Sequence, residues 1–272
     1  MDYIIWDITL LWCNILAMGK TKTSWGNVSK WYSKNVGEKG SYYHDQVIFP
    51  FIEQVWNLGN DDSLLDLGCG EGVLSRRVKG YGRYHGVDAS NKLLTIAREK
   101  NNSDNVDFSQ YDLSREFSLD TPLFSHAAVI LAFQNVENPN MLVQNASRHL
   151  IDEGELLLVI NHPAYRIPKG SGWGVDHDSG LHYRKIYKYM SKQKIRIDMN
   201  PGNKSTKNFT YSYHHSLTDI SRMLFMNGFT IKLIEELVSN KVSEGKNSTQ
   251  ENFIRKEIPM FMCILAKKNN EN

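Results

Sequence analysis

The feature that most constrains the fold of this chain is a glycine-rich run that follows a short apolar segment. Leu64 to Leu67 are apolar apart from Asp66, and residues 68–72 read Gly-Cys-Gly-Glu-Gly. Glycine has no Cβ, so it accepts left-handed backbone and lets other groups approach closely. A helix-like stretch follows from Val73 to Val78. The run therefore predicts a strand, a tight turn and a helix whose free N–H groups face a ligand.

Apolar runs and helical segments alternate after this turn. Strands are predicted over 84–87, 106–111, 127–133 and 155–160, with helices over 90–100 and 141–150. Such alternation implies right-handed crossovers and a parallel sheet, so the fold class is α/β. A helix starting at Ser216 and two strands over 229–238 and 258–266 complete the pattern, and the polar residues 239–257 are expected to form a loop.

The length of 272 residues fits one large domain, and 41% hydrophobic residues support a real core. We expect a poorly packed extension over 1–23 and a single domain over 24–272. Within it, 24–58 form a helical lid, 60–161 the ligand-binding core, 162–215 an aromatic and basic insertion after strand five, and 216–272 the rest of the sheet. Residues 3–17 are apolar but carry Asp7, and fit neither a signal peptide nor a membrane span. Two interpretations are open: translation naturally starts at Met18, or residues 1–17 form a short extra helix packed on the domain.

The three cysteines, Cys13, Cys69 and Cys263, are far apart in the sequence and form no CxxC pair. This pattern argues against a structural zinc site and favours a reducing cytoplasm over a disulfide scaffold. No metal site is expected. The net charge of +2 favours no class of partner.

An acidic residue lies in or directly after each of the first three predicted strands: Asp66, Asp88 and Asp112. Each acid alone is most simply a helix cap or a loop charge. Three together at the carboxyl edge of one sheet fit a shared ligand better, because open α/β sheets bind ligands at that edge. A nicotinamide-binding turn would show G-x-G-x-x-G, whereas the spacing here is G-x-G-x-G.

With Asp66, the glycine run reads D-x-G-x-G-x-G and resembles the first motif of the class I S-adenosylmethionine-dependent methyltransferases. The resemblance covers residues 60–161. It implies a three-layer Rossmann-like fold, with a seven-stranded, mostly parallel sheet, helices on both faces, and S-adenosylmethionine as cofactor. It implies that Asp66 lies near the methionine amino group, Asp88 on the ribose hydroxyls and Asp112 on the adenine amine. Further cofactor contacts are expected at Gly68, Cys69, Gly70, Ala89, Leu113 and Phe133.

The acceptor pocket is expected between the lid and the insertion, and His162, which follows strand five closely, is the best general-base candidate. A histidine that only satisfies loop hydrogen bonds is the simpler interpretation. Expected substrate contacts are Tyr32, Tyr43, Gln134, Tyr165, Arg166 and Trp173. The lid aromatics could equally be plain core residues.

The class of acceptor is less constrained. After strand four the chain reads Ala-Phe-Gln-Asn, residues 132–135, and lacks the Asp/Asn-Pro-Pro-aromatic segment typical of amino methylation on DNA bases. We predict a small-molecule acceptor. Eight basic residues within 184–207 keep an RNA-directed methyltransferase as an alternative, although a solvated face explains them more simply. A binding protein without catalysis is the third hypothesis.

Overall fold

The computed structural model describes residues 40–199 and 209–270. The expected extension over 1–23 and residues 24–39 of the expected lid, which include Tyr32, lie outside the described residues. The described end of the lid contains a π-helix, η2 (His44–Ile48), that continues into helix α2 (Phe49–Val55). Pro50 lies in the first turn of α2, the part of a helix that tolerates proline.

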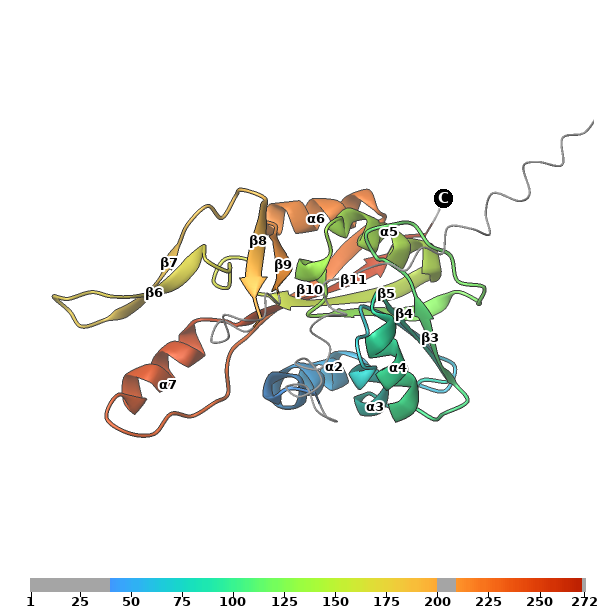
Figure 1. Cartoon of the computed structure of the whole chain (residues 1–272), viewed down its shortest axis with the longest axis horizontal. Coiled ribbons are helices and arrows are strands. Elements are labelled where there is room, and N and C mark those ends of the chain that lie inside the picture. The colour runs from blue at the N-terminus through green and yellow to red at the C-terminus, as the bar shows by residue number, and fades with distance from the viewer. Residues whose placement is uncertain (1–39, 200–208, 271–272) are drawn as a thin grey trace, which may run out of the picture.

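A seven-stranded sheet forms the centre of the described structure (Figure 1). Its strands are β1 (Ser63–Leu67), β2 (Arg83–Asp88), β3 (Val106–Gln110), β4 (Phe124–Ile130), β5 (Leu150–Asn161), β10 (Phe229–Leu237) and β11 (Phe261–Lys268). The order is β10-β11-β5-β4-β1-β2-β3, and β11 runs antiparallel to both of its neighbours. The predicted seven-stranded, mostly parallel sheet is confirmed, and the carboxyl ends of β1 to β5 meet at one edge.

Helices cover both faces of this sheet, as the sequence pattern predicts. They are α3 (Val73–Arg77), α4 (Asn91–Lys100), α5 (Pro139–His149) and α6 (Leu217–Met226), together with α2. Figure 1 shows α5 and α6 on one face and α2, α3 and α4 on the other. Ser90 caps α4, and Ser216 forms a reciprocal capping box with Asp219 at the start of α6.

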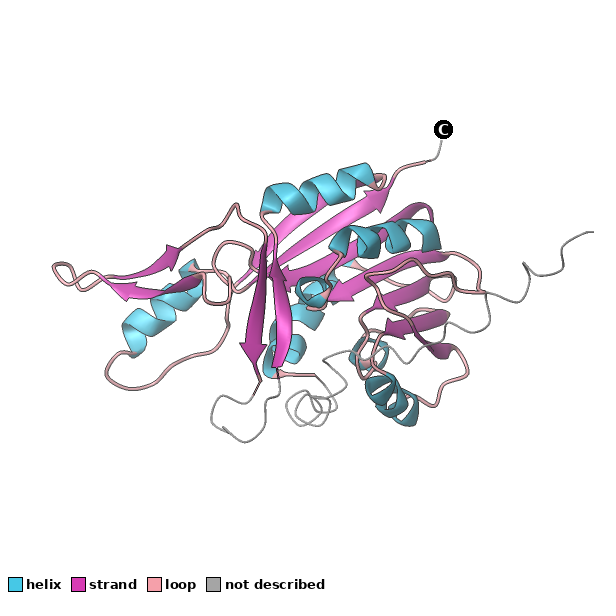
Figure 2. Ribbon diagram, turned by 45° about the horizontal axis from the view of Figure 1, so that its top comes forward, coloured by secondary structure: helices cyan, strands magenta, loops and turns pink. Residues whose placement is uncertain are grey.

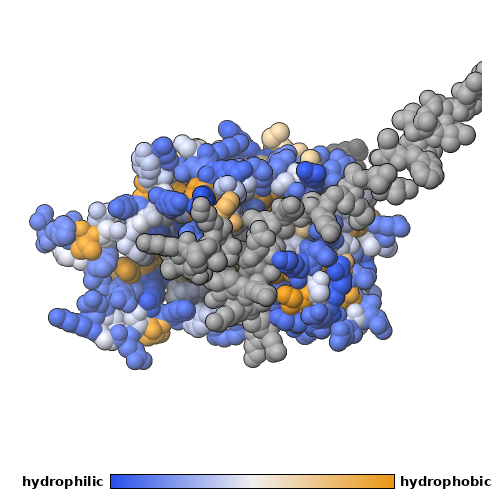
Figure 3. Space-filling model, viewed as in Figure 1, coloured by the Kyte–Doolittle hydropathy of each residue, from blue (hydrophilic) through white to orange (hydrophobic). Residues whose placement is uncertain are grey.

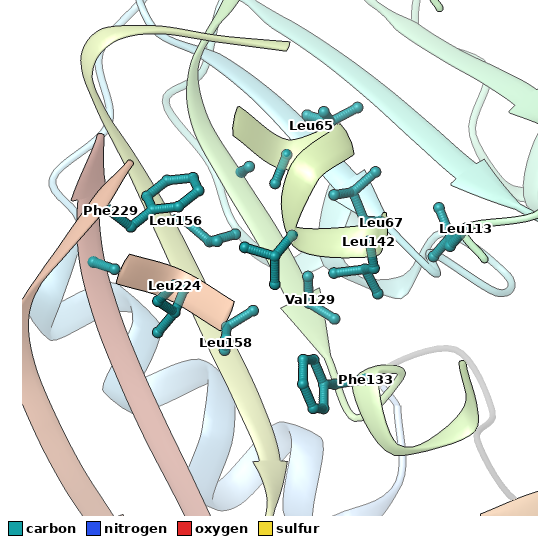
Figure 4. Close-up of a cluster of buried hydrophobic side chains, with 14 of the residues drawn as sticks. Leu65, Leu67, Leu113, Val129, Phe133, Leu142, Leu156, Leu158, Leu224 and Phe229 are labelled. Carbon is teal, nitrogen blue, oxygen red and sulfur yellow. The ribbon is translucent and has the colours of Figure 1, made fainter. Parts of the chain in front are cut away.

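Adjacent residues of a strand belong to two separate hydrophobic cores, because successive side chains of a strand point to opposite faces of the sheet. Leu65 and Leu158 pack with α5 and α6, in the cluster drawn in Figure 4. Leu64 and Leu157 pack with α2, α3 and α4 on the other side. All four leucines are fully buried. This double burial explains why β1 and the second half of β5, from Leu156 to Ile160, are almost continuously apolar in sequence.

The insertion after β5 contains two hairpins that the sequence did not predict. They are β6 (Ser171–Val175) with β7 (His182–Ile186), and β8 (Gln193–Asp198) with β9 (Phe209–His214). The first hairpin is largely exposed, so it carries no apolar alternation to signal a strand. Figure 2 shows β8 and β9 standing across the end of the central sheet.

Two further sequence expectations were wrong. Residues 239–257 are not all loop, because helix α7 (Ser248–Glu257) occupies their second half. None of its residues is buried, so no hydrophobic spacing marked it. The strand expected over 127–133 ends at Ile130, and the short 3₁₀ helix η3 (Phe133–Asn135) follows it.

Most of the surface that Figure 3 displays is hydrophilic, with small separate hydrophobic areas. Leu181, Phe225 and Val242 are among the exposed apolar residues, and they come from three different parts of the chain. Among residues 40–199 and 209–270, we find no helix with the length and apolar character needed to cross a membrane.

Candidate active site

The glycine turn after β1 adopts backbone that only glycine takes up without strain. Gly68, Gly70 and Gly72 have φ values of +86°, +54° and +67°. The N–H of Gly68 donates to the carbonyl of Val87 at 2.7 Å, which ties the turn to β2. A Cβ on Gly68 would lie 2.4 Å from the Cβ of Ala132. The turn is therefore fixed in shape and pressed against the segment that follows β4.

Asp66 lies beneath this turn and is almost fully buried. Its Oδ2 accepts a hydrogen bond of 2.6 Å from the hydroxyl of Tyr84, which is also buried. Burial and, to a smaller extent, the charge of Asp88 raise the pKa of Asp66 to about 7, while the hydrogen bond from the Tyr84 hydroxyl opposes the shift. Sequence reasoning missed Tyr84, although it lies two positions from Gly86 in a strand whose alternate residues must face the core.

The Asp88 carboxylate joins the ends of β1 and β2. Its Oδ2 accepts from the N–H of Gly70 at 3.1 Å, and its Oδ1 accepts from the N–H of Ser90 at 2.7 Å. Burial raises the pKa of Asp88, while these backbone donors and that of Ala89 oppose the shift. A carboxylate has about four acceptor positions, so Asp88 keeps acceptor capacity for a ligand hydroxyl.

Two residues that follow β3 have different surroundings: Leu113 borders the glycine turn, and Asp112 has its partners within its own loop. Leu113 is buried, and its Cδ1 would lie 3.7 Å from a Cβ on Gly68. Asp112 accepts from the N–H of Ser114 at 2.9 Å and lies 3.7 Å from the guanidinium of Arg115. Its partners are therefore local ones, as the simple loop interpretation expects, while Leu113 is placed beside the turn.

The segment after β4 carries a strained residue. Leu131 has a φ of +54°, a left-handed backbone that costs a residue with a side chain about 1–3 kcal/mol. Its carbonyl accepts from Nε2 of Gln134 at 2.8 Å. Phe133 is buried, and Figure 4 labels it at the end of the apolar cluster. The strain places Ala132 against the glycine turn and Phe133 and Gln134 beyond it.

Both ring nitrogens of His162 have partners. Its Nδ1 accepts from the backbone N–H groups of Ala164 and Tyr165, each at 3.2 Å, so Nε2 carries the proton and donates to Glu236 at 2.6 Å. Burial lowers the pKa of His162, and Glu236 opposes that shift. The ring also stacks on Tyr165 at 4.6 Å. These bonds fix the loop after β5, and they leave His162 no free nitrogen with which to accept a substrate proton.

Two other candidates, Tyr43 and Trp173, lie elsewhere. The hydroxyl of Tyr43 lies 3.4 Å from the hydroxyl of Ser239, and the Tyr43 ring packs edge-on against Phe261. Trp173 lies on the exposed first hairpin, with the guanidinium of Arg184 above its ring at 5.0 Å. Neither lines the cavity described below.

Cys69 is buried inside the glycine turn. Burial raises the pKa of its thiol, and the charges of Asp66 and Asp88 add to the shift. The thiolate is therefore disfavoured, and Cys69 is unsuited to act as a nucleophile. In the described part of the chain, no three His, Cys, Asp or Glu residues are grouped so as to hold a metal ion.

A small cavity lies at the carboxyl ends of β4 and β5. Residues 133–134, 160–163, 166–168 and 212–215 line it, together with Ile220 of α6. Gln134 and Arg166, both expected as substrate contacts, are among these residues, and so is His162. His215 was not foreseen, because it lies in an irregular stretch more than 50 positions from His162. The hairpin of β8 and β9 brings it to the cavity.

A left-handed glycine turn, a carboxylate at the end of the next strand and this sheet order together define a Rossmann-like methyltransferase fold. A family model described as a methyltransferase domain matches residues 65–158. The crystal structure of an S-adenosylmethionine-dependent methyltransferase from Mesorhizobium loti has a TM-score of 0.65 at 22% identity, over 80% of this chain and 96% of that one. Residues 65–158 thus match a methyltransferase domain, and the chain shares the fold of a solved S-adenosylmethionine-dependent methyltransferase.

Two relatives are similar in sequence. An uncharacterized methyltransferase of Schizosaccharomyces pombe is 27% identical over 183 residues, which is 66% of this chain and 64% of that protein. Ubiquinone biosynthesis O-methyltransferase of Glaesserella parasuis is 28% identical over 109 residues, which is 37% of this chain and 46% of that protein. The matches thus span less than two thirds of the length of either relative.

Proposed function

We propose that this protein transfers the methyl group of S-adenosylmethionine to a small-molecule acceptor by in-line displacement. The observation that carries the proposal is the cavity beside Phe133 and Gln134, at the sheet edge next to the glycine turn. Because β9 covers this edge, the site is a recess and not an open groove. A recess of this kind aligns a small acceptor and excludes water, which are the main contributions a protein makes to this reaction.

The cofactor supplies a reactive methyl sulfonium, and the described residues fit its adenosyl part. We propose that Asp88 binds the ribose hydroxyls through its remaining acceptor capacity. A side chain at Gly68 would collide with Ala132 and displace the turn that the cofactor must approach. Leu113 offers an apolar surface for the adenine ring, and Asp112 remains our proposal for the adenine amine.

The basic residues of the insertion support the small-molecule acceptor over RNA. Lys194 pairs with Glu137 at 2.6 Å, and Lys192 lies 3.9 Å from Asp219. The guanidinium of Arg196 lies over a ring of the same hairpin at 4.2 Å. Three of the basic side chains are thus engaged within the protein. The similarity to a ubiquinone biosynthesis O-methyltransferase agrees with a small acceptor.

The test is transfer of labelled methyl from S-adenosylmethionine to a panel of small hydroxyl, amine and carbon acceptors, with transfer RNA as the alternative. We expect turnover on small acceptors, with little change between 50 and 200 mM salt. Turnover on RNA that falls by orders of magnitude over that range would favour the RNA-directed alternative instead. Tight cofactor binding without turnover on any acceptor would favour a binding protein.

A further inference from the structure

The cavity beside Phe133 contains three buried polar atoms without a partner. They are Oε1 of Gln134, Nε of Arg166 and Nδ1 of His215, and none has a hydrogen bond within residues 40–199 and 209–270. Native proteins leave few buried polar atoms unpaired, and a group of them at one site needs an explanation. Three around one cavity indicate that a ligand with matching polar groups completes the site.

Arg166 provides a positive charge that no carboxylate of the described residues neutralises through an ion pair. The acids near the two cavity histidines are already engaged. Glu236 accepts from His162 at 2.6 Å, and Asp219 takes part in the capping box with Ser216. A partly buried guanidinium without an anion is unfavourable, so the missing partner is expected to be anionic.

A second guanidinium strengthens the positive field here. Arg184 donates to the carbonyl of Tyr165 at 2.8 Å and to the hydroxyl of Ser171 at 2.9 Å, both neutral groups. Burial lowers the pKa of Arg184, and the nearby charge of Arg166 lowers it further. Two cations with neutral partners side by side favour an anion between or beside them.

The size of the cavity indicates which anion fits. Its volume of about 30 Å³ has room for about two water molecules. A planar carboxylate fits this narrow space better than a tetrahedral phosphate, and the rest of the acceptor must lie at the open side of the cavity. Arg binds a carboxylate through parallel N–H donors, which suits a planar group in a narrow recess.

The other two atoms require a hydrogen-bond donor from the ligand. Nε2 of Gln134 already donates to Leu131, so its Oε1 is left as an acceptor. Burial lowers the pKa of His215, while Asp219 opposes the shift and Lys192 and His214 add to it. His215 is therefore neutral at pH 7, and its Nδ1 accepts a proton when Nε2 carries the ring hydrogen. A ligand hydroxyl has one hydrogen and so donates to one of these acceptors, and we assign it to Nδ1 of His215.

We propose that the methyl acceptor is a small hydroxy acid, with its carboxylate on Arg166 and its hydroxyl facing His215. This inference rests on the proposed function. In the transfer step the hydroxyl oxygen bonds to the methyl carbon, and the methyl–sulfur bond breaks to leave S-adenosylhomocysteine. The hydroxyl proton passes to Nδ1 of His215. The ring of His215 meets Phe133 edge-on at 6.2 Å, and the adjacent Ala132 touches the glycine turn, so the base lies on the cofactor side of the cavity.

The anion site is tested by binding, independently of turnover. Benzoate, benzamide and phenyl phosphate are titrated into the full chain with S-adenosylhomocysteine present, and followed by NMR. Benzoate is expected to bind at least about tenfold more tightly than the other two. Arg166→Gln should abolish that preference, Arg166→Lys should keep part of it, and Lys185→Gln, which removes an exposed charge from the same insertion, should leave it intact. Preference for phenyl phosphate would overturn the carboxylate assignment, and equal binding of all three would overturn the anion site.

The role of His215 is tested with the hydroxybenzoate isomers as acceptors. His215→Gln should lower kcat about 100-fold or more while benzoate still binds, and His182→Gln on the exposed hairpin should have no effect. In the wild type, kcat should rise with pH as His215 loses its proton, which it does at a lowered pKa. This rise of kcat with pH, the limb of the pH profile, should be absent in His215→Gln. A variant that keeps the limb would contradict proton transfer to His215.

Calorimetry with S-adenosylmethionine distinguishes a failure of the proposed function from a failure of the hydroxy-acid inference alone. If the wild-type chain does not bind the cofactor, the proposed function fails. If it binds the cofactor and methylates neutral alcohols as well as acids, the methyltransferase proposal stands and the hydroxy-acid inference fails.

Discussion

Replacing Asp88 by Asn is the most direct perturbation of the proposed ribose contact. In the wild type, each carboxylate oxygen accepts a hydrogen bond from one backbone N–H group, that of Gly70 at 3.1 Å and that of Ser90 at 2.7 Å. We assign the acceptor positions that remain to the ribose hydroxyls. Asparagine keeps one oxygen and turns the other into a donor, so one ligand bond and its charge are lost.

A hydrogen bond to a charged group contributes about 1.5–3 kcal/mol. Losing one should therefore raise the Kd for S-adenosylmethionine about 10- to 150-fold. Asp88→Ala should weaken binding further, because both ligand bonds and both backbone bonds disappear. Isothermal calorimetry measures the affinity, and thermal melting of each variant checks that the fold is intact.

Asp107→Asn is the matched control, since Asp107 lies exposed on the neighbouring strand β3. It removes the same charge and should leave the affinity unchanged. A well-folded Asp88→Asn variant whose Kd stays within about twofold of the wild type would refute the ribose assignment, since a lost charged bond cannot cost so little.

The remaining predictions concern the turn and its buried acid. Gly68→Val should abolish cofactor binding and lower the free energy of unfolding by several kcal/mol, since its Cβ would lie 2.4 Å from Ala132 at a φ of +86°. Gly180→Ala, with similar φ but open space, should cost only about 1–2 kcal/mol in urea unfolding. For Asp66 the folded pKa of about 7 lies above the ordinary value of 3.8, so the folded state holds the proton more tightly and stability falls as pH rises from about 4 to 7. Asp66→Asn should remove that slope, and an unchanged slope in urea unfolding would contradict the assignment. Tyr84→Phe should extend this fall in stability to higher pH, because the hydroxyl stabilises the ionised form and its loss raises the folded pKa of Asp66 further.

Much of the fold could be predicted because its signals are local. The run from Leu64 to Gly72 forces a strand, a left-handed turn and a helix start, and the structure has all three. Ser90 and Ser216 start helices as their capping chemistry predicts. The apolar run of β5 from Leu156 to Ile160 indicates a parallel strand, because both faces of such a strand are covered. These features need no knowledge of distant contacts.

The acceptor side could not be predicted to the same extent. His162 was the natural base candidate because it follows β5, yet its two nitrogens are taken by the loop and by Glu236, 74 positions away. His215 reaches the cavity only because the unforeseen hairpin of β8 and β9 folds over the sheet edge. Helix α7 escaped detection because it buries nothing.

The sequence alone determined the α/β alternation, the glycine turn and the acids at the strand ends, because backbone dihedrals and burial periodicity are written in neighbouring residues. Only the tertiary structure decided which polar atoms share one cavity. Arg166 and His215 are 49 positions apart, and their meeting depends on a long-range packing of hairpin against sheet that no local pattern encodes.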